Sequence, residues 1–179
     1  MRQIIKIITL SVFMLFPSHS QACNDAQRIK NLCNYVVNLI DGSPKTQVSN
    51  FLFRIAIVES QLKYRTQIGG GTALGLWQME PKTCIDTIKH SPDLKTNHFL
   101  LRQFGLIETT NHECIKYLLE NSDIYGCIMA RLYLKRFKEP IPNSLQEQGE
   151  YYEKYYNRGG NGNAEIFVQK VKNYENKNK

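Results

Sequence analysis

Glu59 is an ionisable residue on a face that should otherwise be apolar. Between Val48 and Lys63, apolar residues recur with the 3.6-residue period of an amphipathic helix, and Glu59 falls on the same face. Burying an unpaired carboxylate costs several kcal/mol, so the group must find a partner or keep its proton at neutral pH. A carboxyl group that is still protonated at neutral pH can act as a general acid. The alternative is that Glu59 lies at the edge of the stripe and pairs with Arg54 or Lys63.

Residues 1–22 have the three-part layout of a secretory signal peptide. Arg2 and Lys6 accompany an apolar run over residues 4–16, and small residues close the segment at 20–22. The run is too short to span a bilayer as a stable helix, and no later run approaches the roughly 20 residues that a span needs. We therefore expect an exported protein, periplasmic or secreted, with no stable membrane span.

A lipid anchor at Cys23 is the alternative outcome of export. Cys23 follows Ala22 directly, as in a lipidation site. Ser20, however, stands where such sites carry Leu or another bulky aliphatic residue, which disfavours the anchor.

All five cysteines follow the signal segment, and an oxidising compartment would allow them to pair. They are Cys23, Cys33, Cys84, Cys114 and Cys127. Two disulfides among four of them are predicted, and the sequence leaves the pairing open. A zinc site at His112 and Cys114 is disfavoured because no Cys-x-x-Cys or His-x-x-x-His pair supplies further ligands, so no metal is expected.

The exported segment is long enough for one domain with a real core, at about 150 residues. Removing Arg2 and Lys6 leaves 21 Lys and Arg against 16 Asp and Glu, so the formal net charge falls from +7 to +5. The densest basic run lies over residues 170–179 and is interpreted as a solvated, fraying terminus. No helix-turn-helix or basic stripe is visible, so nucleic acid is not an expected partner.

Helical periodicity dominates this domain. It predicts helices near 25–39, along the Glu59 stripe, over 83–89, over 123–138 and around 167–174. The glycines within 68–72 predict a tight hairpin or the wall of a cleft. Alternating strand patterns are nearly absent, so the fold class is mainly α.

Three short motifs follow one another in a recognisable order. Glu59-Ser60 closes the apolar helix, Gly75-Leu76-Trp77-Gln78 follows the glycine-bearing loop, and Tyr156-Asn157-Arg158-Gly159 precedes the last helix. Each motif is weak alone. Together with residues 167–171 they resemble the lysozyme-like lytic transglycosylases, which cleave the glycan strands of peptidoglycan, over about residues 48–174.

The segments 73–81 and 130–133 are most similar to versions of this domain carried by phages. Members of the family commonly have an Asn-Pro after the Glu-Ser pair, Met in place of Trp77 and Ala in place of Arg158. These departures concern substrate contacts and leave the acid unchanged.

The resemblance implies a lysozyme-like single domain over residues 23–179, with a glycan-binding cleft and no cofactor. Glu59 would protonate the leaving oxygen and then, as carboxylate, take the proton from the sugar's own C6 hydroxyl, which closes a 1,6-anhydro ring. The acids near the second motif, Glu80 and Asp86, have no clear claim to be a second catalytic carboxylate. We expect Glu80 to cap or pair at the start of the helix that follows Pro81.

Five residues are candidates for holding the substrate or the acid. Tyr156 would place its hydroxyl against the catalytic carboxyl, Ser60 would support that carboxyl by a hydrogen bond, and Asn157 would fix the turn. Gln78 would contact the sugar or, alternatively, hold its own loop through a backbone bond. Trp77 would stack on a sugar ring or fill the core.

The sequence leaves two other functions open on the same glycan. A muramidase would cleave the same bond with water and a second acid, and a non-catalytic peptidoglycan-binding protein would keep the cleft without the reaction. The expected partners are peptidoglycan strands and, as one biological setting, a cell-envelope secretion apparatus. Wall remodelling, secretion, antagonism and phage-derived lysis all remain possible roles.

Overall fold

The computed structural model describes residues 19–67, 69–92, 110–158, 160 and 162–178, with side chains from residue 25 onward. Its helices are α1 (His19–Asp41), α2 (Thr46–Ser60), α3 (Pro81–His90), α6 (His112–Asn121), α7 (Asp123–Leu134), α8 (Leu145–Tyr151), the π-helix η1 (Tyr152–Tyr156) and α9 (Ala164–Lys177). In these residues the β-structure is limited to isolated bridges. The mainly α class predicted from the sequence is confirmed.

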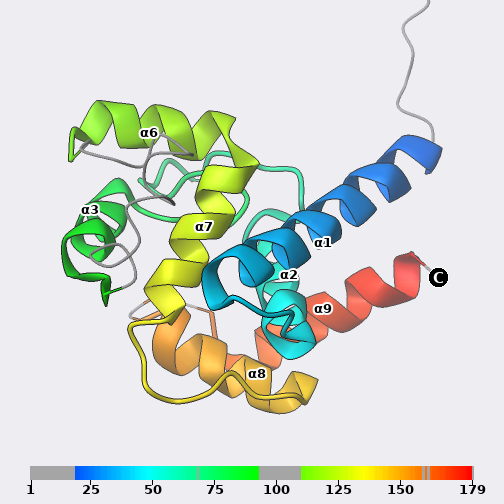
Figure 1. The fold of residues 1–179 in the computed structure, drawn as a ribbon. Helices are drawn as coiled ribbons and strands as arrows, with labels where there is room; N and C mark the ends of the chain where they lie inside the picture. The colour runs from blue at the N-terminus through cyan, green and yellow to red at the C-terminus, as the bar shows by residue number, and fades with distance from the viewer. Residues whose placement is uncertain (1–18, 68, 93–109, 159, 161, 179) are drawn as a thin grey trace, which may run out of the picture.

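The helices pack around α2 and α7 (Figure 1). Helix α2 contacts α1, α7 and α9, and most of its residues are buried. Helices α3 and α6 contact each other and α7, while α8, η1 and α9 form a second group that reaches α2 through α9. Among the described residues, no helix is long and apolar enough to cross a membrane.

Five of the helices lie where periodicity predicted them, with shifted ends. Helix α1 begins at His19, inside the segment assigned to the signal peptide. Helix α7 is mostly buried as expected, but it ends at Leu134 rather than near 138. It ends because the backbone turns more tightly there, with N–H groups of Arg136 and Phe137 donating to carbonyls three residues back. Pro140 therefore does not terminate this helix.

Two α-helices, α6 and α8, were not predicted, and their signals are N-terminal caps. The side chain of Asn111 accepts hydrogen bonds from the N–H groups of Glu113 and Cys114 at the start of α6. At α8, the Ser144 hydroxyl accepts from the Glu147 N–H and donates to the Glu147 carboxylate. Both helices are short, at 10 and 7 residues.

The cysteine prediction is wrong for the described residues. Cys33, Cys84, Cys114 and Cys127 are all free thiols. Cys127 donates an S–H hydrogen bond to Cys33 with the two sulfur atoms 4.0 Å apart, which is well beyond the roughly 2.05 Å of a disulfide. Three of these four thiols are buried. At Cys84, burial raises the thiol pKa far above its usual value, so this thiol is unreactive. Cys23 lies outside the side chains described.

A buried ion pair joins α1 to α7. The side chain of Asp41 is 1% exposed, and the Arg131 guanidinium donates to both of its oxygens at 2.8 Å. Lys45 and Lys135 approach the same carboxylate at 3.7 Å. Because Arg131 is itself buried, loss of the carboxylate would leave a charge without its partner inside the protein.

We predict that Asp41→Ala lowers the free energy of unfolding by about 3 to 5 kcal/mol, the usual cost of breaking a buried pair on one side. Urea denaturation followed by circular dichroism measures it. The matched control is Asp25→Ala. Asp25 is 64% exposed and lies 3.6 Å from Arg28, and because exposed ion pairs contribute little, this variant should lose less than about 1 kcal/mol of unfolding free energy. Equal losses in the two variants would show that the buried pair has no special role.

Candidate active site

The last turn of α2 presents Glu59 at the edge of the core. Glu59 is half-buried, whereas Val58 and Ser60 on either side of it are fully buried. The helix ends one residue later, where Gln61 and Leu62 both have left-handed backbones, with φ of 54° and 58°. Two consecutive non-glycine residues in this region are strained, and such strain is concentrated at functional sites. The chain thus turns sharply away and leaves the carboxyl group accessible.

Tyr152 holds the carboxyl group of Glu59. Its hydroxyl donates to Oε1 of Glu59 at 2.7 Å. Tyr152 begins the π-helix η1, whose wider turn is closed by a hydrogen bond from the Asn157 N–H to the Tyr152 carbonyl. Single π-turns of this kind often occur at functional sites. Tyr152 is buried, so its hydroxyl is a fixed partner rather than a mobile surface group.

Burial raises the pKa of Glu59 above its usual value, and this effect outweighs two others that lower it. The hydrogen bond from Tyr152 and the positive charge of Lys170 both favour the carboxylate. The Lys170 ammonium also donates to the Val58 carbonyl at 2.9 Å, which docks α9 on the last turn of α2. The basic run near the end of the chain is therefore helical through Lys177, and the prediction of a fraying terminus is wrong for this part.

The second motif forms a tight turn. Leu74 and Met79 pair through two backbone hydrogen bonds of 3.0 Å, and Leu74 also bridges Thr66, so the segment that contains the glycines is hairpin-like, as one of the two predictions proposed. Gly75 has φ of +72°, and a Cβ there would lie 2.4 Å from the Leu119 carbonyl oxygen. Only glycine fits this position.

Trp77 and Gln78 have structural roles in place of the predicted sugar contacts. The Trp77 side chain is 1% exposed and donates from its ring nitrogen to the Leu52 carbonyl at 2.9 Å, so it fills the core and does not stack on a sugar. Gln78 donates from its amide nitrogen to the Gly75 carbonyl at 2.8 Å, which holds the loop. Gln78 is only partly buried and has a left-handed backbone with φ of 45°, so it is a further strained residue beside Gln61 and Leu62.

Two of the predicted contacts with Glu59 are wrong. The Tyr156 hydroxyl donates instead to the Trp77 carbonyl at 2.7 Å, which ties the third motif to the second. The Ser60 hydroxyl is fully buried and donates to the Ala56 carbonyl one turn back in α2. Asn157 fixes the turn as predicted, with its amide donating to the Gly162 carbonyl at 2.8 Å.

Tyr152 was not among the residues that the sequence indicated as partners of Glu59. A signal was available, because Tyr152 precedes Tyr156 by four residues and therefore shares its helical face. The two rings are stacked, with centroids 6.0 Å apart.

The other charged residues named near Glu59 have partners elsewhere. Arg54 bonds to Gln148 and pairs with Glu175, so the interpretation in which it neutralises Glu59 is wrong. Glu80 is the N-cap residue of α3, as expected for a group at the start of that helix, but its carboxylate accepts from the Thr72 hydroxyl rather than from the helix.

Asp86 is paired with Arg136 and His90. The hydrogen bond from Arg136 is the main reason why the pKa of Asp86 lies below its usual value. A carboxyl group with a lowered pKa is ionised at neutral pH and is a poor proton donor.

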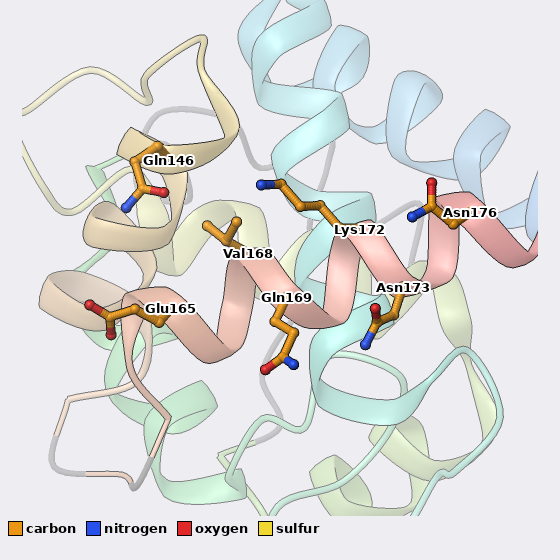
Figure 2. Close-up of a pocket in the computed structure, with 7 residues that line it drawn as sticks. All are labelled: Gln146, Glu165, Val168, Gln169, Lys172, Asn173 and Asn176. Carbon is orange, nitrogen blue, oxygen red and sulfur yellow. The ribbon is translucent and has the colours of Figure 1, made fainter.

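Three surface pockets lie on the described part of the protein. The pocket in Figure 2, of about 400 Å³, lies along the outer side of α9 and is closed by Gln146 of α8. A second, of about 300 Å³, is lined by Ile57, Gln61 and residues of α9, next to the end of α2. A third, of about 470 Å³, lies between α3 and the residues that follow α7 and η1. Glu59 lines none of these three pockets.

The arrangement at Glu59 can hold and deliver one proton. It consists of a half-buried carboxyl group with a raised pKa, one hydroxyl donor and one nearby cation. In the part of the chain that the structure describes, no group of three or more His, Cys, Asp or Glu side chains converges as a metal site would require. Comparison with known protein families, curated proteins and solved structures finds no significant match to this chain.

We predict that Tyr152→Phe raises the pKa of Glu59 further, because the lost hydrogen bond favours the charged carboxylate. Titration of the Glu59 carboxyl carbon by NMR should give a midpoint above 4.5 in the parent and a still higher midpoint in the variant. The matched control is Tyr156→Phe, whose hydroxyl bonds to Trp77 and not to Glu59. The same midpoint in parent and Tyr152→Phe would rule out the hydrogen bond as the group that tunes the acid.

Proposed function

We propose that the protein is a peptidoglycan lytic transglycosylase that cleaves the bond between MurNAc and GlcNAc and leaves a 1,6-anhydro end. The observation that carries this proposal is the state of Glu59, a half-buried carboxyl group with a raised pKa that a buried tyrosine holds at 2.7 Å. A raised pKa increases the fraction of the Glu59 carboxyl group that keeps its proton at a given pH, which general acid catalysis requires. The resemblance of the three motifs supplies the substrate class.

The reaction needs one carboxyl group in two roles. Glu59 donates its proton to the glycosidic oxygen as the bond from that oxygen to C1 of MurNAc breaks. The carboxylate that results takes the proton from the C6 hydroxyl of the same sugar, and the C6 oxygen forms the new bond to C1. Glu59 ends the cycle protonated, and no water is consumed.

The neighbours of Glu59 suit this exchange. Desolvation favours the protonated form at the start, while Tyr152 and Lys170 stabilise the carboxylate that forms after proton donation. The Tyr152 hydrogen bond also orients one carboxyl oxygen and leaves the other for the substrate. Among the described residues, the groups that act on the pKa of Glu59 include no second carboxylate, which favours the intramolecular hydroxyl over an activated water.

The proposal includes export and a single lysozyme-like domain with a glycan-binding cleft. The signal-like segment directs the chain to the periplasm or the outside, where peptidoglycan lies. The cleft would have to reach the exposed edge of Glu59 at the end of α2, beside the turn formed by the second motif. A secretion apparatus remains a proposed partner.

We predict that Glu59→Gln lowers the rate of peptidoglycan cleavage at least about 100-fold, because an amide cannot donate the proton. Release of soluble muropeptides from purified sacculi measures the rate. The control is Glu165→Gln, which changes an exposed carboxyl group in the pocket of Figure 2 and should leave the rate unchanged. Parental activity in Glu59→Gln would overturn the assignment of the acid.

Glu59→Gln should become more stable relative to the parent protein as the pH rises. Glu59 has a folded-state pKa above its unfolded value, so its contribution to stability is complete below about pH 4.5 and is lost as the pH rises through the raised pKa. Glutamine does not titrate. The free energy of unfolding of the variant relative to the parent should therefore increase with pH across this window, as measured by urea denaturation at a series of pH values.

The products separate the transglycosylase from its alternatives. Mass spectrometry of muropeptides released by the parent should show ends that are one water lighter than hydrolysed ends, because the C6 hydroxyl replaces water. Reducing ends alone would identify a muramidase. Binding to sacculi with no released product would identify a non-catalytic peptidoglycan-binding protein.

A further inference from the structure

A cationic cavity adjoins the third motif, because Arg158 of that motif is one of its lining residues. Its volume is about 470 Å³, and it is formed by the first turns of α3, the end of α7 and the residue that follows the turn after η1. Its charged lining residues are Lys82, Asp86, Arg136 and Arg158. Three cations thus face one carboxylate, so the cavity has an excess of positive charge.

Asp86, the only carboxylate among the lining residues, pairs with Arg136 but not with Lys82 or Arg158. Asp86 bonds to Arg136 at 2.6 Å and to the ring of His90 at 3.0 Å. Among the described contacts, neither Lys82 nor Arg158 has a carboxylate partner. These two cations are therefore available to an anionic ligand that enters the cavity.

Arg158 is held in a fixed orientation. Its guanidinium lies over the Phe137 ring at 4.9 Å, and its Nε donates to the Lys154 carbonyl at 3.2 Å. Stacking occupies the flat face of the guanidinium, and the backbone bond uses one edge. The two terminal nitrogens keep their N–H groups for a ligand, in the fork geometry that matches a carboxylate.

A row of tyrosine rings connects the cavity to Glu59. Tyr133 lines the cavity and contacts the Tyr156 ring edge-on at 5.9 Å. Tyr156 stacks on Tyr152 at 6.0 Å, and the Tyr152 hydroxyl bonds to Glu59. The cavity and the acid therefore flank the same ring stack. The centroids of successive rings are 5.9 and 6.0 Å apart, so an extended peptide of four residues, which spans roughly 13 Å, is long enough to pass along them.

We propose that this cavity binds the carboxylate groups of the peptide stems that peptidoglycan glycan strands carry. This inference rests on the proposed function for its substrate class. Carboxylates pair with Arg158 and Lys82, and the aliphatic parts of the stem pack on the Phe137 and Tyr133 rings. The Asp86 carboxylate in the lining repels a dianion such as phosphate more strongly than it repels a single carboxylate.

Calorimetric titration of the parent protein with the free tetrapeptide stem tests the site without any turnover. Binding should weaken at least about tenfold in Arg158→Gln, and also for the same peptide with its carboxylates amidated. Arg158→Lys should restore only part of the affinity, because an ammonium keeps the charge and loses the fork. The matched control is Lys172→Gln, an exposed cation of α9 in the pocket of Figure 2, which should bind as the parent does.

Two results would overturn the inference. One is equal affinity for the stem and its amidated form. The other is displacement of the stem by inorganic phosphate at equimolar concentration, which would show a general anion site. NMR spectra of the parent, recorded before and after addition of the stem, locate the bound peptide. The chemical shifts of the Arg158 side chain should change on addition.

Turnover separates this inference from the proposed function. Arg158→Gln should raise KM for stem-bearing strands by a larger factor than it raises KM for stem-free strands. If the parent releases 1,6-anhydro products yet does not bind the stem, the inference fails and the function stands. If the parent binds the stem but releases no such product, the function fails and the peptide site stands.

Discussion

The burial of α2 is the constraint on which the other features of the structure depend. This helix packs against α1, α7 and α9, and its apolar residues from Val48 to Val58 lie almost wholly inside. A helix surrounded on several sides can carry a carboxyl group only near one end, where the neighbouring elements diverge. Glu59 occupies the last turn, and the strained left-handed residues that follow carry the chain away from it. The stability of the core therefore sets both the location and the desolvation of the acid.

The proposed reaction places opposite demands on Glu59, which must donate a proton and later take one up. Complete burial without partners would leave the carboxyl protonated and unable to take up a proton, while full exposure would leave it ionised and unable to donate one. Burial raises its pKa, and Tyr152 and Lys170 oppose that rise. These partners come from η1 and α9, so docking of the C-terminal elements on α2 completes the site. The free energy that desolvation costs is offset by the surrounding core.

The three motifs act as one unit because their backbone and aromatic groups are joined. Tyr156 bonds to the Trp77 carbonyl, and Trp77 bonds to the Leu52 carbonyl in α2. Most of the motif residues are therefore supports that hold the turns around Glu59, with few side chains free to touch a ligand. The cationic cavity adjoins the same rings at Tyr133, and there Arg158 offers the exposed polar groups that the motif interior lacks.

The sequence by itself determined the helical class, the approximate positions of five helices and the identity of the unusual acid, because periodicity is a local property of consecutive residues. It did not determine which hydroxyl reaches Glu59. Tyr152 lies 93 residues away in the chain, and the partner was set by the docking of η1 on α2 and by the π-turn that follows. The same holds for Trp77, whose ring could face a ligand or the core until the packing of α2 and α7 enclosed it. Contacts between distant segments depend on the shape of the whole core, which no local pattern encodes.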